Sequence, residues 1–320
     1  MKQLIHLIFF LFFLQGSNAL ANKKKFDWTI KAASFNATNT ITVLQEDLVA
    51  EESGQPNLNP KIQFETRSPA STAYSFAGGG FGLSYSQEGE FDEEQQLEQN
   101  LETKSSTFVA FYDFLKLSTE VFIMDQKGYV IANPQEIFSN WDPESMKPEY
   151  PEMRVKTQGL SIYYTFDDND YSIAQMTSQT EKLTHGFGFS WLVGLQAKST
   201  TIENIPTVNV TVDDIGEITI DDINIASWTP YLGAGWHFGA GNFYVSPALM
   251  LGAARVTNFS DSSDVAASDL ASKLFFPFGY HGESFFMGVS TQFDHLPLGQ
   301  ELNEVKVDRL NAEVFIGAHF

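Results

Sequence analysis

The chain has 320 residues, no cysteine and a formal charge of −21 at pH 7. This strongly acidic balance argues against nucleic acid as a partner. Because cysteine is absent, disulfides, thiolate metal sites, a cysteine nucleophile and the lipid anchor of a bacterial lipoprotein are excluded.

Residues 1–21 have the order of a cleaved secretory signal peptide. Lys2 is basic, residues 4–14 are apolar, and Ala19-Leu20-Ala21 has the small side chains of a cleavage site. The apolar stretch is shorter than the roughly 20 residues that a membrane-spanning helix needs. We therefore predict cleavage before Asn22 and export from the cytoplasm.

Residues 22–60 are interpreted as an N-terminal segment with a possible first strand between Phe26 and Gln45. From residue 61 to residue 320, apolar and polar side chains alternate in long runs, as in the segment 187–197, where Phe187, Trp191 and Leu195 share one face. Many runs have ten or more residues, which suits a tilted strand that crosses a bilayer in about 9 to 11 residues. A soluble β-sandwich would instead bury the apolar face between two sheets.

Short turns and aromatic residues suggest how such strands are connected. Aromatic side chains gather around the turns at 239–242 and 280–283, as in the belt of a transmembrane barrel at a membrane interface. These turns, and shorter connections near 69–72, 114–117 and 167–170, are assigned to the periplasmic side, and the longer segments to the outside. A strand at Val208, Val210 and Val212 keeps this order consistent. The prediction is an all-β, antiparallel up-and-down transmembrane β-barrel of about 14 strands, with about 12 as the alternative.

The last strand ends on an aromatic residue, and apolar side chains occupy every second position before it. This pattern resembles the signal by which bacterial outer-membrane barrels are recognised for insertion, so we expect the barrel-insertion machinery to be a partner. Phe315 lies between the positions of the pattern and interrupts the otherwise polar or small face. The predicted signal comprises Leu310, Ala312, Val314, Ile316, Ala318 and Phe320.

Four stretches carry a family resemblance: KGYVIAN (127–133), YPEMR (150–154), LSIYYTFDDNDYSI (160–173) and QTEKLTHGFGFSWLVGL (179–195). Together they are similar to a family of Gram-negative outer-membrane β-barrel proteins known as a domain of unknown function, of the DUF4421 type. The resemblance implies an outer-membrane barrel reached by export through the periplasm. It implies no activity and no site residues.

No catalytic, nucleotide-binding or metal-binding motif occurs, so we expect neither an enzyme nor a cofactor or metal. A lipase embedded in the barrel is the remaining enzymatic alternative, but none of the six histidines is followed two positions later by serine. Arg255 shares a strand face with Leu251 and is a candidate partner for a lipid phosphate at the outer rim. The candidates that face the lumen are Gln196, His237, Gln292, Asp294 and Glu313.

These observations leave three hypotheses for function. The first is a passive pore or a transporter of an unidentified small molecule or ion in the outer membrane. The second is a closed structural or adhesive barrel whose acidic outer loops, around 88–104 and elsewhere, contact lipopolysaccharide or another surface. The third is a secreted soluble β-sandwich. Outer-membrane lipid and lipopolysaccharide are expected partners in the first two.

Overall fold

The computed structural model describes residues 28–45, 61–66, 71–88, 104–114, 116–145, 147–168, 170–173, 186–210, 216–259, 268–300 and 303–320. The predicted signal peptide and the core of the acidic segment around 88–104 lie outside these ranges. No helix in the described ranges has the length and apolar character needed to cross a membrane.

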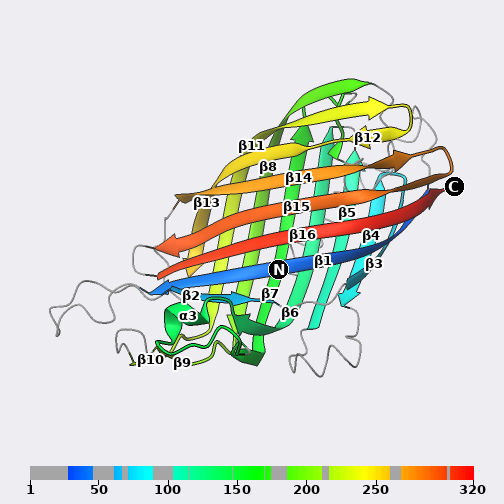
Figure 1. The fold of residues 1–320 in the computed structure, drawn as a ribbon. Helices are drawn as coiled ribbons and strands as arrows, with labels where there is room; N and C mark the ends of the chain where they lie inside the picture. The colour runs from blue at the N-terminus through cyan, green and yellow to red at the C-terminus, as the bar shows by residue number, and fades with distance from the viewer. Residues whose placement is uncertain are drawn as a thin grey trace.

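Nearly all described strands belong to one antiparallel sheet (Figure 1). The first half of the chain contributes β1 (Thr29–Gln45), β2 (Lys61–Glu65), β3 (Ser71–Gly78), β4 (Phe81–Glu88), β5 (Lys104–Phe114), β6 (Leu117–Ile131) and β7 (Glu149–Thr165). The second half contributes β8 (Phe187–Glu203), β11 (Ile223–Ala240), β12 (Phe243–Val245), β13 (Ala248–Phe259), β14 (Ser268–His281), β15 (Phe285–Gln300) and β16 (Asn303–His319). A short helix, α3 (Pro134–Ile137), follows β6.

The sheet closes on itself and forms a barrel. β1 pairs with β16 over their whole lengths, and β8 pairs with β11. None of these four strands is therefore a free edge of the sheet. The hydrogen bonds of each strand are therefore satisfied by its neighbours, which a strand in lipid requires. The alternative of a soluble β-sandwich is wrong, because a single sheet forms a ring and, within the described ranges, no second sheet packs on its apolar face.

The fourteen strand segments of this sheet occupy twelve positions around the ring. β2 and β3 both run antiparallel to β1 and continue one another, and β12 and β13 likewise both pair with β11 and β14. The predicted periplasmic connection at 69–72 is therefore wrong, since it lies between two parts of one wall position. The tight turn is instead at Gly79 and Gly80, whose positive φ angles of 61° and 79° favour glycine.

The strand expected at Val208–Val212 also takes a different place. β9 (Val208–Val210) pairs only with β10 (Gly216–Ile218) in a separate hairpin within the connection from β8 to β11. This correction and the previous one bring the predicted ring of about fourteen strands to twelve. Most long connections emerge at one end, here called the outer end, and most short turns at the other, the inner end. The short inner connection predicted at 167–170 is wrong, because β7 ends at Thr165 and β8 begins only at Phe187, while β15 and β16 are joined at the outer end by only two residues.

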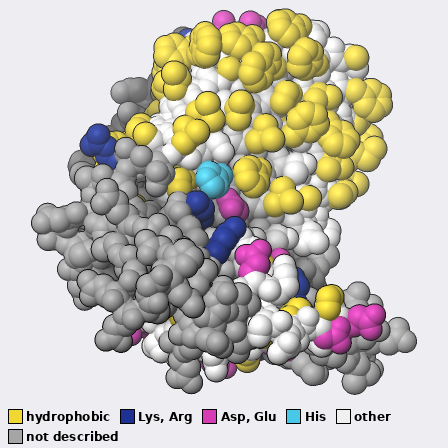
Figure 2. Space-filling model, turned by 60° about the vertical axis from the view of Figure 1, so that its left-hand side comes forward, with side chains coloured by type: hydrophobic (Ala, Val, Ile, Leu, Met, Phe, Trp, Pro, Cys, Tyr) yellow, Lys and Arg dark blue, Asp and Glu magenta, His cyan; other side chains and the backbone are white. Residues whose placement is uncertain are grey.

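Every position of the ring carries at least one exposed apolar side chain on its outward face. In Figure 2 hydrophobic side chains cover a broad part of the surface, and charged side chains gather beside it toward one end. Such a belt is the surface that a transmembrane barrel presents to lipid. One exposed apolar side chain from each ring position is Ile30, Phe76, Leu83, Phe108, Ile123, Tyr164, Trp191, Leu232, Leu251, Phe276, Met287 and Val314.

Aromatic rings border this belt at the inner end. Tyr280 makes ring contacts with Phe243 at 5.4 Å and with Phe285 at 5.0 Å, which joins the two turns that the sequence predicted to be aromatic. Two of the aromatic residues in these clusters, Tyr244 and Phe286, are buried on the inner face instead. Their side chains follow the alternation of their strands and therefore fill the lumen.

Candidate functional site: a charged chamber inside the barrel

A cavity of about 220 Å³ lies inside the barrel and is bounded by inward-facing side chains from strands around the ring. Four of the five side chains predicted to face the lumen line it: Gln196, Gln292, Asp294 and Glu313. We call this cavity the chamber. The fifth, His237, is also buried on the inner face, where its Nδ1 lies 2.7 Å from Ser246 Oγ, but it does not line the chamber.

Neighbouring strands satisfy part of the polar lining. Gln196 Nε2 donates a hydrogen bond to Ser161 Oγ at 2.9 Å, which joins β8 to β7. Gln292 Nε2 donates to Asp294 Oδ2 at 2.9 Å along β15. Because Gln292 and Asp294 are two residues apart on one strand, their side chains point to the same face.

Two ion pairs, one buried and one partly buried, join adjacent strands in the chamber. Lys273 on β14 is 3% exposed, and its Nζ lies 3.6 Å from Asp294 Oδ1 on β15. Lys31 on β1 lies 2.8 Å from Glu313 Oε1 on β16, across the closing pair of strands. The Lys273 ammonium also lies 5.5 Å from the ring of Tyr231, which provides a cation–π contact.

Two further cations line the chamber without a carboxylate partner among the described residues. The Lys198 ammonium lies 6.0 Å from the ring of Phe122. Arg309 donates from Nη1 to the sulfur of Met124 at 3.1 Å, and its buried Nε has no hydrogen-bond partner within the described part of the chain. Sulfur is a weak acceptor, so this guanidinium is poorly satisfied.

Residues 170–173, the described part of the connection from β7 to β8 that enters the barrel, lie on the inner side of the chamber. Tyr171 is fully buried, and a Cβ on Gly235 of β11 would lie 2.3 Å from Cζ of the tyrosine ring. Only glycine allows the ring to approach the wall so closely. Ile173 lines a smaller cavity of about 50 Å³, which shares Glu120 and Lys273 with the chamber.

An apolar core occupies the outer end. Ile137 of α3, Val208 of β9 and Ile218 of β10 are fully buried in one cluster with the inward-facing side chains of Phe64 and Tyr129. α3 and the β9–β10 hairpin lie at this end in Figure 1. The polar chamber therefore lies between an apolar core at the outer end and the buried Tyr171 and Ile173 at the inner end.

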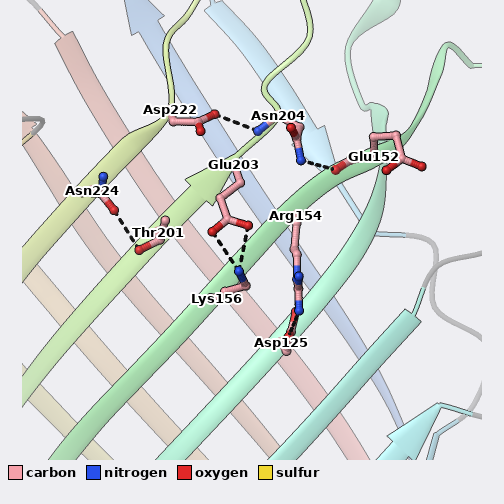
Figure 3. Close-up of polar contacts among 9 residues, drawn as sticks. All are labelled: Asp125, Glu152, Arg154, Lys156, Thr201, Glu203, Asn204, Asp222 and Asn224. Carbon is pink, nitrogen blue, oxygen red and sulfur yellow. Dashed lines mark hydrogen bonds and ion pairs between the residues drawn. The ribbon is translucent and has the colours of Figure 1, made fainter.

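The wall carries a separate group of charges on its outward face near the outer end (Figure 3). Arg154 Nε donates to Asp125 Oδ1 at 2.7 Å, and Lys156 Nζ lies 2.8 Å from both carboxylate oxygens of Glu203. On β6 the last apolar side chain of the belt is Ile123, so Asp125 lies beyond the membrane-spanning part of that strand. The hydrogen bond from Arg154 lowers the pKa of Asp125.

Arg255 lies on the outward face, as its alternation with Leu251 indicates. Its guanidinium lies 5.4 Å from the ring of Trp228 on the neighbouring strand β11. The side chain is exposed and stacked over an aromatic ring at the outer margin of the belt. Its pairing with a lipid phosphate stays a prediction.

The chamber also contains charged residues that the sequence reasoning missed: Lys31, Glu120, Lys198, Lys273 and Arg309. Period-two alternation could have found two of them, because Lys198 is two residues after Gln196 and Arg309 is four residues before Glu313. The apolar run of β8 ends at Ala197, which hid the continuation of the strand to Glu203. Lys273 gives no local sign that it pairs with Asp294.

Comparisons with known proteins supply a family but no activity. A family profile described as "Domain of unknown function (DUF4421)" matches residues 19–317. No curated protein matches the chain.

Solved structures are similar at low identity. The outer membrane protease OmpT from Escherichia coli is 8% identical, with 93% of this chain and 99% of that chain covered and a TM-score of 0.40. The translocator domain of autotransporter NalP from Neisseria meningitidis is 8% identical, with 100% and 98% covered and a TM-score of 0.40. The transport unit of autotransporter AIDA-I from Escherichia coli is 11% identical, with 96% and 94% covered and a TM-score of 0.36.

Proposed function

The chain belongs to the DUF4421 family, and from this premise we propose that it is an outer-membrane transporter of small polar solutes. Family membership supplies no activity, so the proposal depends on the chamber. The solute would enter the chamber from one end of the barrel and leave into the periplasm past Tyr171 and Ile173. Their displacement would distinguish this transporter from a passive, permanently open pore.

The observation that carries the proposal is the set of buried charged side chains in the chamber. Moving a charged side chain from water into the protein costs several kcal/mol, and a salt bridge often does not recover this cost. Apolar residues of similar volume would stabilise a purely structural barrel as well or better. Lys273 and Asp294 are nevertheless only 3% and 7% exposed to solvent. A role in contacting a polar solute accounts for their presence.

Liposome swelling tests the proposal. Purified full-length protein in liposomes should admit glycerol and sodium acetate faster than protein-free liposomes do. Raffinose, a trisaccharide, should be excluded because it is too large for a chamber of about 220 Å³. Swelling equal to that of protein-free liposomes for every solute would contradict transport.

The closed barrel with acidic outer loops is the second candidate, and the apolar core at the outer end together with the buried Tyr171 and Ile173 at the inner end favours it. Under this alternative, deletion of the acidic segment 89–103 should abolish attachment to envelope or cell surfaces and leave membrane insertion unchanged. Liposomes containing the protein should then show no swelling response to either small solute.

A further inference from the structure

We propose that the chamber binds a small oxyanion, a carboxylate or phosphate group, between Lys198 and Arg309. The inference rests on the proposed transport function, because it names the class of solute. It goes beyond that function because it assigns a binding site and a negative charge to the solute.

The charge balance of the chamber is the first argument. Its cationic side chains are Lys31, Lys198, Lys273 and Arg309. Its carboxylates are Glu120, Asp294 and Glu313. Four cations against three carboxylates give a formal charge of +1, in a chain whose overall charge is −21. One negative charge from a solute would make the chamber neutral.

The pairing of these groups is the second argument. Two of the carboxylates are taken by the ion pairs Lys31–Glu313 and Lys273–Asp294. Of the three carboxylates, Glu120 forms no ion pair in the described part of the chain, so two cations and one carboxylate lack an ion-pair partner there. A cationic solute would face a surplus of like charge, whereas an anion would receive donors from both unpaired cations.

The chemistry of the two cations is the third argument. Arg309 presents a planar fork of donors that matches the two oxygens of a carboxylate or phosphate. Its buried Nε lacks an acceptor, and its Nη1 has only the Met124 sulfur. An oxyanion would supply the missing oxygen acceptor. Lys198 on β8 and Arg309 on β16 both line the chamber of about 220 Å³.

The size of the chamber sets the size of the solute. Ligand pockets for drug-sized molecules have volumes of about 300 to 1,000 Å³. A chamber of about 220 Å³ is smaller, and several of its boundaries are fixed by strands of the wall. It suits an oxyanion of a few heavy atoms.

Isothermal titration of the full-length protein in detergent tests the inference. The probes are acetate, inorganic phosphate and acetamide, which has the shape of acetate without its charge. At least one anion should bind and acetamide should not. Lys198→Met and Arg309→Met should each weaken binding roughly tenfold or more, because each removes a charge-assisted hydrogen bond. Comparison of acetate with phosphate identifies which oxyanion the site prefers.

Lys127→Met is the matched control. Lys127 pairs with Glu152 on the outward face, so its replacement removes one positive charge without touching the chamber. Anion affinity should be unchanged. Heat-modifiable gel mobility checks that each variant is folded, and Lys198→Met alone suffices if Arg309→Met does not fold.

The results separate the inference from the proposed function. Absence of acetate and phosphate binding, or equal affinity in the wild type and Lys198→Met, would overturn the oxyanion site. If liposomes containing the protein still swell in glycerol, transport survives that result. Oxyanion binding that depends on Lys198, in a protein that admits no solute, would support the site and contradict transport.

Discussion

Individual charged residues have different roles on the two faces of the wall. Inside, Lys273 and Asp294 are almost fully buried and are held by contacts across neighbouring strands. Outside, the side chains of Asp125 and Arg154 keep about a third of their surface in water, at 33% and 38%. Water weakens an ion pair, so the outer pairs are expected to contribute little stability.

The Asp125–Arg154 pair predicts a small dependence of stability on pH. The pKa of Asp125 is lowered in the folded protein, so its stabilising effect is present above the unfolded pKa of about 3.9 and is lost as the pH falls through the folded pKa. Asp125→Asn should therefore lower the free energy of unfolding in urea by about 1 kcal/mol or less at pH 7. The difference from the wild type should disappear in strong acid.

Asp221→Asn is the control for this measurement, because Asp221 is an exposed carboxylate in the connection from β8 to β11. It removes the same charge without removing a carboxylate that accepts a hydrogen bond from a guanidinium. An equal loss of stability in both variants at pH 7 would show that net charge, and not the pair, is responsible.

At the scale of elements, the side chains of each strand alternate between the outward and the inward face of the wall. The connections differ in whether their side chains are buried inside the barrel. β16 shows this alternation clearly, with Leu310, Val314 and Ile316 exposed to the outside and Phe315 buried inside against Phe286. The interruption of the sequence pattern at Phe315 is thus an aromatic side chain that fills the lumen. The connection after β7 differs from the other inner turns because its Tyr171 enters the barrel.

Tyr171→Ala should open the inner side of the chamber. Loss of the ring removes the side chain that packs on Gly235, so glycerol-driven swelling of liposomes should become several-fold faster. The variant should also unfold more readily, because truncation of a buried aromatic residue typically costs about 3 to 5 kcal/mol.

Tyr164→Ala provides the comparison, since Tyr164 lies near the end of β7, shortly before Tyr171 in the chain, but is exposed on the outward face. It should leave swelling unchanged. If folded Tyr171→Ala protein transports glycerol no faster than the Tyr164→Ala protein, Tyr171 does not close the chamber.

For the whole molecule, the central physical claim is that the outward belt contacts hydrocarbon. Leu232 on β11 is 60% exposed, which would be an unfavourable position for a large apolar side chain in water. In a bilayer the same position is favourable. The belt therefore determines how the barrel is oriented and which part of the wall extends beyond the membrane.

Leu232→Arg tests this placement. A charged side chain near the middle of a bilayer destabilises a barrel by about 2 to 4 kcal/mol, whereas near the interface the cost falls to about 0 to 1 kcal/mol. Asn224→Arg, on the same outward face of β11 but beyond the belt, should therefore cost much less. Urea unfolding from liposomes measures both. Equal and negligible effects would mean that this face is in water.

The sequence by itself determined the face on which each side chain lies, because alternation is a local property of a strand. It placed Gln196, His237, Gln292, Asp294 and Glu313 inside and Arg255 outside, and it identified the barrel class. Local pattern also supported a strand at Val208, but it could not show that this strand pairs with β10 outside the ring.

Only the tertiary structure decided which distant residues meet. Lys31 and Glu313 pair because β1 and β16 close the ring, although they are separated by most of the chain. Strand register and ring closure are set by the simultaneous pairing of all the strands, and no local pattern encodes them. For the same reason, the twelve wall positions and the entry of Tyr171 into the lumen emerged only from the folded barrel. The same holds for Lys198 and Arg309, which line the chamber without a carboxylate partner among the described residues.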